Sequence, residues 1–169
     1  MLRFLSILAL TTALLSADPF ASGNKAVGIT VGSGSVSYSG GLFTSSKVEN
    51  YYILGVSASY FIADNLDIGL GYRGWFGGTP KIHQATIPVT YYMPTDSKFR
   101  PYLGGFYRYT DISSDLYDDY SSVGGRAGVA IVFRNGYAGF GWVQEVYLDA
   151  DNTSDSSSGY PEATVGFSF

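Results

Sequence analysis

The chain of 169 residues contains no cysteine. That absence excludes a disulfide scaffold, a thiolate metal site, a cysteine nucleophile and a lipid anchor on cysteine. Charge is scarce too: Asp, Glu, Lys and Arg make up 14% of the residues, and no basic run offers nucleic-acid phosphates a counter-charge. Histidine occurs once, and nothing in the residues supports a metal, a nucleotide or a redox cofactor.

Glycine and aromatic residues are abundant instead. The chain has 22 glycines and 15 tyrosines, aromatic residues reach 17%, and the formal net charge is -4. Tyrosine and glycine raised together, with charge lowered, suit strands that meet lipid and pack tightly. The length suits a single domain.

The first segment has the pattern of an export signal. Arg3 supplies a positive start, and the apolar run 4–15 has the length of a signal-peptide core, too short to span a bilayer as a helix. We expect cleavage after Ala17, although Leu15 at the minus-three position is bulkier than usual. The alternative is a buried N-terminal helix. The expected organisation is therefore a signal peptide at 1–17 and one domain at 18–169, with no spanning helix.

The rest of the chain alternates apolar and polar residues with period two, which indicates half-buried strands. The first segment, for example, places Val27, Ile29 and Val31 on one face. Each segment has about the nine to eleven residues that a tilted spanning strand needs. Eight strands are predicted, near residues 25–35, 51–62, 66–72, 85–91, 100–110, 123–133, 138–148 and 163–169.

The connections between these strands alternate in character. Those after the second, fourth and sixth strands are short, whereas those after the first, fifth and seventh are longer and rich in Ser and Asp. The connection after the third strand is an exception, because it is no longer than the one after the fourth. Short turns at one end and longer loops at the other are typical of outer-membrane barrels. Asn135-Gly136 is the strongest hairpin signal, because both residues tolerate positive φ. Two residues depart from the pattern: Pro88 predicts a bulge or a missing ladder bond, and Gln144 on the apolar face predicts a bulge or the membrane boundary.

The composition of the two strand faces distinguishes a membrane barrel from a soluble one. The polar face carries many small residues, which weaken a water-facing strand but suit a narrow lumen filled by side chains. The apolar face carries aromatics near the strand ends, as interfacial girdles require. These aromatics are Tyr52, Tyr60, Tyr72, Tyr91, Tyr109, Phe133 and Phe169.

Five charged residues fall on the polar face, toward the loop ends of their strands. They are Arg73, Arg108, Arg126, Glu145 and Glu162. We expect them to form an ion-pair cluster that fills this part of the lumen, because an unpaired buried charge costs several kcal/mol. Arg126, Glu145 and Glu162 lie on three successive strands and are expected to meet side by side. The catalytic alternative, a Glu145–Glu162 carboxylate pair, is disfavoured because nearby arginines would keep both ionised.

Three stretches resemble the small eight-stranded outer-membrane barrels of the OmpA transmembrane domain and OmpX/Ail type. Residues 60–72 resemble the family's strand–tight turn–strand unit, and 100–109 resemble a Pro-Tyr-Leu-Gly strand opening. The ending 163–169 resembles the signal read by the barrel-assembly machinery, with Phe167 and Phe169 as its aromatic residues. The resemblance implies an all-β, antiparallel, up-and-down transmembrane β-barrel with a side-chain-filled lumen, in the outer membrane of a Gram-negative bacterium.

The resemblance specifies architecture far better than activity, so three functions remain open. The first is a structural or surface-interaction role through the outer loops, in adhesion or envelope integrity, for a monomer surrounded by outer-membrane lipid and lipopolysaccharide. The second is a lipid A-modifying enzyme, for which His83 at the outer end of the fourth strand is the candidate base, with Thr79 and Thr86 as the nearby hydroxyls. The third is a narrow pore, which a charged plug would block.

The loops carry a further candidate feature in their aspartates. Clustered carboxylates can solvate a surface or bind calcium or magnesium against anionic lipopolysaccharide. Asp149 and Asp151 begin like a calcium loop, but no glycine or closing glutamate follows at the required positions. The aspartates concerned are Asp111, Asp115, Asp118, Asp119, Asp149, Asp151 and Asp155.

Overall fold

The computed structural model describes residues 18–38, 47–113, 118–148 and 157–169. The expected signal peptide, and Asp115, Asp149, Asp151 and Asp155 of the acidic loops, lie outside these ranges. No helix among the described residues is long and apolar enough to cross a membrane.

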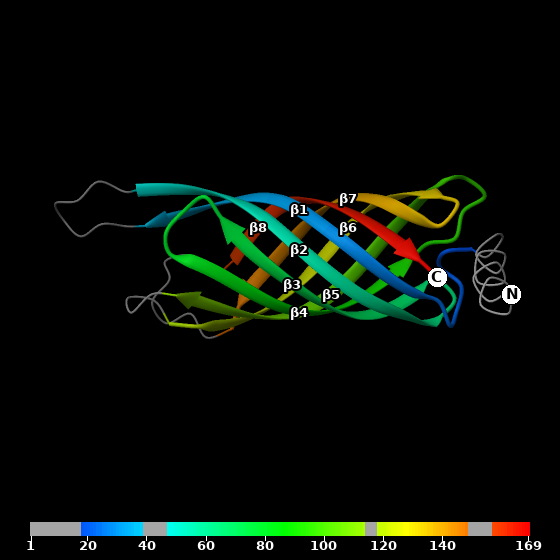
Figure 1. The fold of residues 1–169 in the computed structure, drawn as a ribbon, viewed down its shortest axis with the longest axis horizontal. Helices are drawn as coiled ribbons and strands as arrows, with labels where there is room; N and C mark the ends of the chain where they lie inside the picture. The colour runs from blue at the N-terminus through cyan, green and yellow to red at the C-terminus, as the bar shows by residue number, and fades with distance from the viewer. Residues whose placement is uncertain (1–17, 39–46, 114–117, 149–156) are drawn as a thin grey trace, which may run out of the picture.

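Eight antiparallel strands form one closed barrel in which each strand pairs with its neighbours in sequence. β1 pairs with β8 through residues such as Val27 and Phe167, so the sheet has no free edge. Figure 1 shows the strands running along the molecule at a tilt, with β1 in blue beside β8 in red. The strands are β1 (Lys25–Tyr38), β2 (Lys47–Ala63), β3 (Leu66–Phe76), β4 (Lys81–Tyr92), β5 (Phe99–Ser113), β6 (Tyr120–Phe133), β7 (Gly136–Tyr147) and β8 (Ser157–Ser168).

The connections between strands are divided between the two ends of the barrel. The β2–β3, β4–β5 and β6–β7 connections lie at the end where the chain finishes (Figure 1), which we call the turn end. The other four connections lie at the opposite end, which we call the loop end. The predicted number, order and alternation of strands are confirmed.

The strands are longer than predicted. They span 11 to 17 residues, because several continue past the predicted stops at the loop end. β5 extends to Ser113 and β6 begins at Tyr120, so residues assigned to an acidic loop belong partly to strands. Ladder hydrogen bonds between neighbouring strands satisfy the backbone there without any need for an apolar face, so alternation alone misses these extensions.

The prediction for the Asn135-Gly136 turn is wrong in its details. Arg134 and Asn135 form the turn, Gly136 already begins β7, and neither Asn135 nor Gly136 has a positive φ. Gly136 is needed for space instead, since a Cβ there would lie 2.0 Å from the carbonyl oxygen of Gly166 on β8. A positive φ occurs at Asn65, in the β2–β3 turn, where φ is 65°.

The prediction of an irregular ladder is confirmed at Pro88, whereas no bulge forms at Gln144. The β3–β4 pairing runs from Ile68↔Val89 to Gly71↔Thr86 and leaves the two positions between them unpaired, so the predicted missing ladder bonds beside Pro88 are confirmed. The β4–β5 pairing continues through Pro88↔Phe106. Gln144 does point outward, but the β6–β7 and β7–β8 registers pass through it without a shift, so no bulge forms there.

Apolar side chains cover the outside of the barrel. Leu70 in the middle of β3 is 67% exposed, and all seven predicted girdle aromatics are exposed, including Tyr52 at 75%. Inside, small residues alternate with large ones as predicted, but the lumen also holds two apolar clusters that the alternation did not indicate. One, at the turn end, contains Phe20, Ala26, Phe61, Tyr92, Tyr102, Ala130 and Tyr137. The other, at the loop end, contains Tyr51, Ile53, Trp75, Ile82, Phe106, Val143 and Tyr160.

Candidate functional site in the barrel lumen

Five charged side chains meet inside the barrel, between the two apolar clusters. We call Arg73, Arg108, Arg126, Glu145 and Glu162 the ionic cluster. Successive residues of a strand point to opposite faces of the sheet, and each of these five residues lies at a position that faces the lumen. They come from β3, β5, β6, β7 and β8, so the cluster ties together strands from most of the barrel's circumference.

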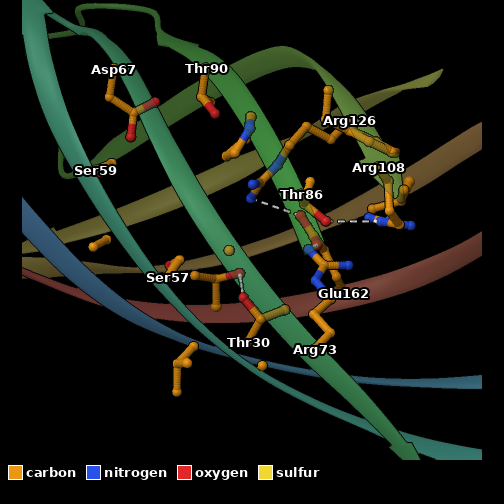
Figure 2. A pocket seen from close by; sticks show the side chains of 18 of the residues that line it. Thr30, Ser57, Ser59, Asp67, Arg73, Thr86, Thr90, Arg108, Arg126 and Glu162 are labelled. Carbon is orange, nitrogen blue, oxygen red and sulfur yellow. Dashed lines mark hydrogen bonds and ion pairs between the residues drawn. The ribbon is translucent and has the colours of Figure 1, made fainter. Parts of the chain in front are cut away.

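Glu162 is the centre of one half of the ionic cluster. The Nη2 atom of Arg73 donates to Oε2 of Glu162 at 3.0 Å. The Nη2 atom of Arg126 lies 2.7 Å from the other carboxylate oxygen (Figure 2). The Arg126 guanidinium also lies over the ring of Tyr102, 5.2 Å from its centroid. One carboxylate is therefore shared between two arginines.

Glu145 is the centre of the other half. Its Oε2 atom accepts from Nη1 of Arg108 and, at 3.2 Å, from the hydroxyl of Ser122. Arg108 is 0% exposed, its Nε donates to the hydroxyl of Thr86 at 3.1 Å, and its guanidinium lies over the ring of Phe106. Every contact of this arginine is made inside the lumen.

Tyr160 connects the two halves. Its hydroxyl accepts from Nη1 of Arg73 at 2.9 Å and from Nη1 of Arg108 at 2.8 Å. Tyr160 is buried and lies on the inner face of β8, two residues before Glu162. Sequence reasoning missed this residue because the predicted eighth strand begins at Ala163, whereas β8 begins at Ser157. The signal for its inward position was that it lies two residues before Glu162 and therefore on the same, polar face of the strand.

The structure brings the five predicted charged residues together, with a different pairing from the one expected. Arg126 and Glu162 meet, but Glu145 pairs with Arg108 instead of lying beside them. The register explains this: Glu145 is opposite Ser158 on β8, four residues from Glu162 and nearer the loop end. Each carboxylate therefore has its own arginine partners, and the two do not form a carboxylate pair.

Buried ion pairs of this kind hold a structure together only while they are complete. Removing charges from water costs several kcal/mol per ion, and mutual attraction offsets this only with good geometry and extra hydrogen bonds. In the ionic cluster, Thr86, Ser122 and Tyr160 supply such hydrogen bonds. The buried Nη2 atom of Arg108 and Nε atom of Arg126 have no hydrogen-bond partner among the described residues.

A small cavity lies next to the ionic cluster, toward the turn end. Its volume is about 40 Å³, and polar side chains such as Thr30, Thr90 and Asp67 contribute to its wall. Figure 2 shows Asp67 apart from the ionic cluster, near Ser59 and Thr90. With Asp67, three carboxylates face three arginines around this part of the lumen. The space suits one or a few water molecules and no organic substrate.

Phe20 closes the lumen at the turn end. It is 0% exposed, its ring stacks on that of Tyr92 with centroids 4.3 Å apart, and it also contacts the rings of Phe61 and Tyr137. The guanidinium of Arg100 lies 4.9 Å from the centroid of Phe20. We call this arrangement the Phe20 plug. Sequence reasoning missed it because residues 18–24 have no strand pattern.

The segment that carries Phe20 is bonded to several parts of the turn end. Arg100 donates to Asp18 at 2.7 Å and to Asn65 at 2.8 Å. The backbone carbonyl of Phe20 accepts from the backbone N–H of Asn65, and that of Pro19 accepts from the hydroxyl of Ser168. The Phe20 plug therefore joins the beginning of the described chain to β8 and to the β2–β3 turn.

His83 lies outside the lumen. Its Nδ1 is 2.7 Å from the hydroxyl of Tyr72, and the two rings are stacked at the outer wall. The expectation that Thr86 lies beside His83 is wrong, because Thr86 faces inward and bonds to Arg108. Residues three apart on a strand point to opposite faces.

In the described part of the acidic loops, Asp119 forms specific hydrogen bonds. Asp119 accepts from the backbone N–H of Ile112 at 3.0 Å and from the hydroxyl of Tyr109 at 2.7 Å. These two donors lower the pKa of the Asp119 carboxyl below its ordinary value of 3.8, the Ile112 N–H more than the Tyr109 hydroxyl. No group of three or more His, Cys, Asp or Glu side chains able to hold a metal ion occurs within the described ranges.

The fold is that of the small eight-stranded outer-membrane barrels. Neisserial surface protein A is 19% identical over 88% of this chain and 98% of its own, with a TM-score of 0.66. The N-terminal β-barrel domain of Pseudomonas aeruginosa OprF is 15% identical over 88% of this chain and 98% of its own, with a TM-score of 0.60. The outer membrane protein OprG of that species is 16% identical over 88% and 97%, with a TM-score of 0.51. Neither a protein-family model nor a curated protein matches the chain.

Proposed function

We propose that this chain, which has the fold of the small outer-membrane barrels, is an integral outer-membrane protein with a structural or surface-interaction role. Its loop end would face the cell's surroundings and act in adhesion or envelope integrity, after export directed by residues 1–17. One observation carries the proposal: the outer wall is apolar between two aromatic rims, and six charged side chains, those of the ionic cluster and Asp67, lie inside. A soluble barrel has the opposite arrangement, because water solvates charges and lipid solvates apolar side chains.

The filled lumen favours a role other than the conduction of solutes or the catalysis of a reaction. Two layers of side chains, the ionic cluster and the Phe20 plug, lie across it, and the space between them is about 40 Å³. Eight strands leave an interior that side chains can fill. The proposed role is therefore performed by the outer surfaces of the barrel, with the lumen contributing rigidity.

Single-cysteine labelling tests location and orientation together, because the chain has no cysteine of its own. Asp118→Cys places a thiol at the loop end and Asp96→Cys places one in the β4–β5 connection at the turn end, both at exposed positions. In intact Gram-negative cells, a membrane-impermeant maleimide should label the Asp118→Cys variant only. After permeabilisation it should label both. Labelling of Asp96→Cys alone in intact cells contradicts the orientation, and a protein that stays soluble without detergent contradicts membrane insertion.

The surface role is tested with cells that express the chain and with a variant whose segments 39–46 and 149–156 are replaced by Gly-Ser sequences of equal length. Wild-type expression should increase adhesion or lower dye uptake relative to empty cells. The loop variant should lose the adhesion while it still migrates as a folded barrel on an unheated gel. Equal adhesion and uptake in all three strains contradict the proposal.

Two measurements address the other functions. Planar-bilayer recordings should show no large, stable conductance, because the ionic cluster and the Phe20 plug block the lumen. Mass analysis of lipid A from expressing cells should match that from empty cells and from cells with His83→Ala. A lipid A change that His83→Ala abolishes would establish an enzyme instead.

A further inference from the structure

The outer wall has an apolar hollow near the turn end. It lies over β1 to β4, has a volume of about 530 Å³ and is walled by outward side chains that include Val27, Tyr60, Leu70, Ile87 and Phe169. We call it the β1–β4 hollow. It is separate from the lumen, and none of the contacts of the ionic cluster involves it.

The hollow exists because of one short side chain among long ones. Ala58 is directly opposite Val27 on β1 and Leu70 on β3, so it occupies the centre of this outward row. Leu70 and Ile87 stand where the β3–β4 ladder is unpaired beside Pro88. The side chains around Ala58 are larger, and the space above its methyl group stays open to the surface.

A cation and a phenol stand at the turn-end rim of the hollow. Lys25 and Tyr60 are directly opposite each other on β1 and β2, and both contribute to the hollow. Both side chains point outward and are exposed, and side chains of directly opposed residues lie within reach of one another. The ammonium supplies a positive charge and the phenol a hydrogen-bond donor, next to an apolar wall.

We propose that the β1–β4 hollow is a binding site for one glycerophospholipid of the membrane leaflet at the turn end. An acyl chain lies over Ala58, between Val27 and Leu70, while the lipid phosphate meets Lys25 and Tyr60. The charge complementarity between a lysine and a phosphate selects this occupant, since an uncharged lipid gains nothing from Lys25. This inference rests on the proposed membrane location.

Native mass spectrometry of the folded protein tests the site. The protein, released from detergent micelles, is titrated with phosphatidylglycerol and, separately, with diacylglycerol, which lacks the phosphate. Wild type should bind one phosphatidylglycerol in a discrete saturable step, about tenfold tighter than any later lipid, and should show no such step with diacylglycerol. The factor of ten corresponds to about 1.4 kcal/mol.

Variants separate the two parts of the site. Ala58→Phe fills the hollow and should abolish the discrete step, and Ala58→Leu is the milder version should Ala58→Phe not fold. Lys25→Gln should weaken the step about fivefold, the effect of one cationic side chain near a lipid surface. The matched controls are Ala127→Phe, an outward alanine on β6, and Lys98→Gln, an exposed lysine at the same end; both should bind as wild type does.

Two outcomes overturn the inference. One is a statistical distribution of bound lipids in wild type with no discrete step. The other is a discrete step that survives in a folded Ala58→Phe or Ala58→Leu variant. Either result leaves the membrane proposal intact, because that proposal fails only if the protein is soluble without detergent.

Discussion

Arg108 on β5 donates to the carboxylate of Glu145 on β7, across the strand that separates them. Both side chains are almost fully buried, with side-chain exposures of 1% and 2%. The pair therefore spans β6 on the inner face of the barrel and is not part of the hydrogen-bond ladder of the wall. Each of the two buried charges is stabilised by the other.

Glu145→Gln should destabilise the barrel by about 3–5 kcal/mol, because Arg108 would keep its charge in a buried site without a counter-charge. Urea unfolding of the protein in lipid vesicles measures the change. Asp96→Asn, at an exposed carboxylate of the turn end, is the control and should change stability little. A loss below about 1 kcal/mol in Glu145→Gln means that the pair contributes no more than an exposed one.

Tyr160→Phe should cost about 1–3 kcal/mol, since the hydroxyl that accepts from both Arg73 and Arg108 disappears. Tyr52→Phe on the outer wall is the control and should cost less. In the double variant with Glu145→Gln the two costs should not add, because both residues contact Arg108. Strict additivity in the same urea assay contradicts a connected cluster.

Phe20→Ala should lower the free energy of unfolding by about 3–5 kcal/mol, the usual cost of truncating a fully buried phenylalanine. It should also open the turn end. A thiol introduced by Ala26→Cys lies in the cluster that Phe20 covers, and it should react with a maleimide faster once Phe20 is truncated. Phe99→Ala, at an exposed position on β5, should leave that rate unchanged. Equal rates in both backgrounds mean that Phe20 does not close the lumen.

Leu70→Arg should destabilise the barrel by about 2–4 kcal/mol, because it places a charge on the outer wall between the two aromatic rims. Leu148→Arg, just past the loop end of β7, should cost about 0–1 kcal/mol. The comparison is made by urea unfolding in vesicles. Equal, small effects at both positions indicate a wall in contact with water.

The contact of Asp119 should depend on pH. The donors Ile112 and Tyr109 lower the pKa of its carboxyl below 3.8, so the contact stabilises the β5–β6 loop end above that pH. The stabilisation is lost as the pH falls through the lowered pKa. Carbon NMR of the Asp119 carboxyl should show a midpoint below 3.8. Tyr109→Phe should raise this midpoint only part of the way, because the Ile112 N–H remains, and a midpoint unmoved by the substitution contradicts the hydroxyl contact.

The sequence by itself determined the strands, their order and which side chains face out. These properties follow from a local rule: successive residues on a strand point to opposite faces, so Val27, Ile29 and Val31 indicate a face without knowledge of any partner. The inward position of the five charged residues follows from the same rule. The role of Phe167 and Phe169 as an assembly signal stays a prediction.

Only the tertiary structure decided which charges pair and what closes the lumen. The pairing of Arg108 with Glu145, and of two arginines with Glu162, depends on the stagger of strands around a closed barrel, which no local pattern contains. Tyr160 and Phe20 were missed for a related reason. Both residues lie outside the strands that the alternation predicts, and their burial in the lumen depends on residues far away in the chain.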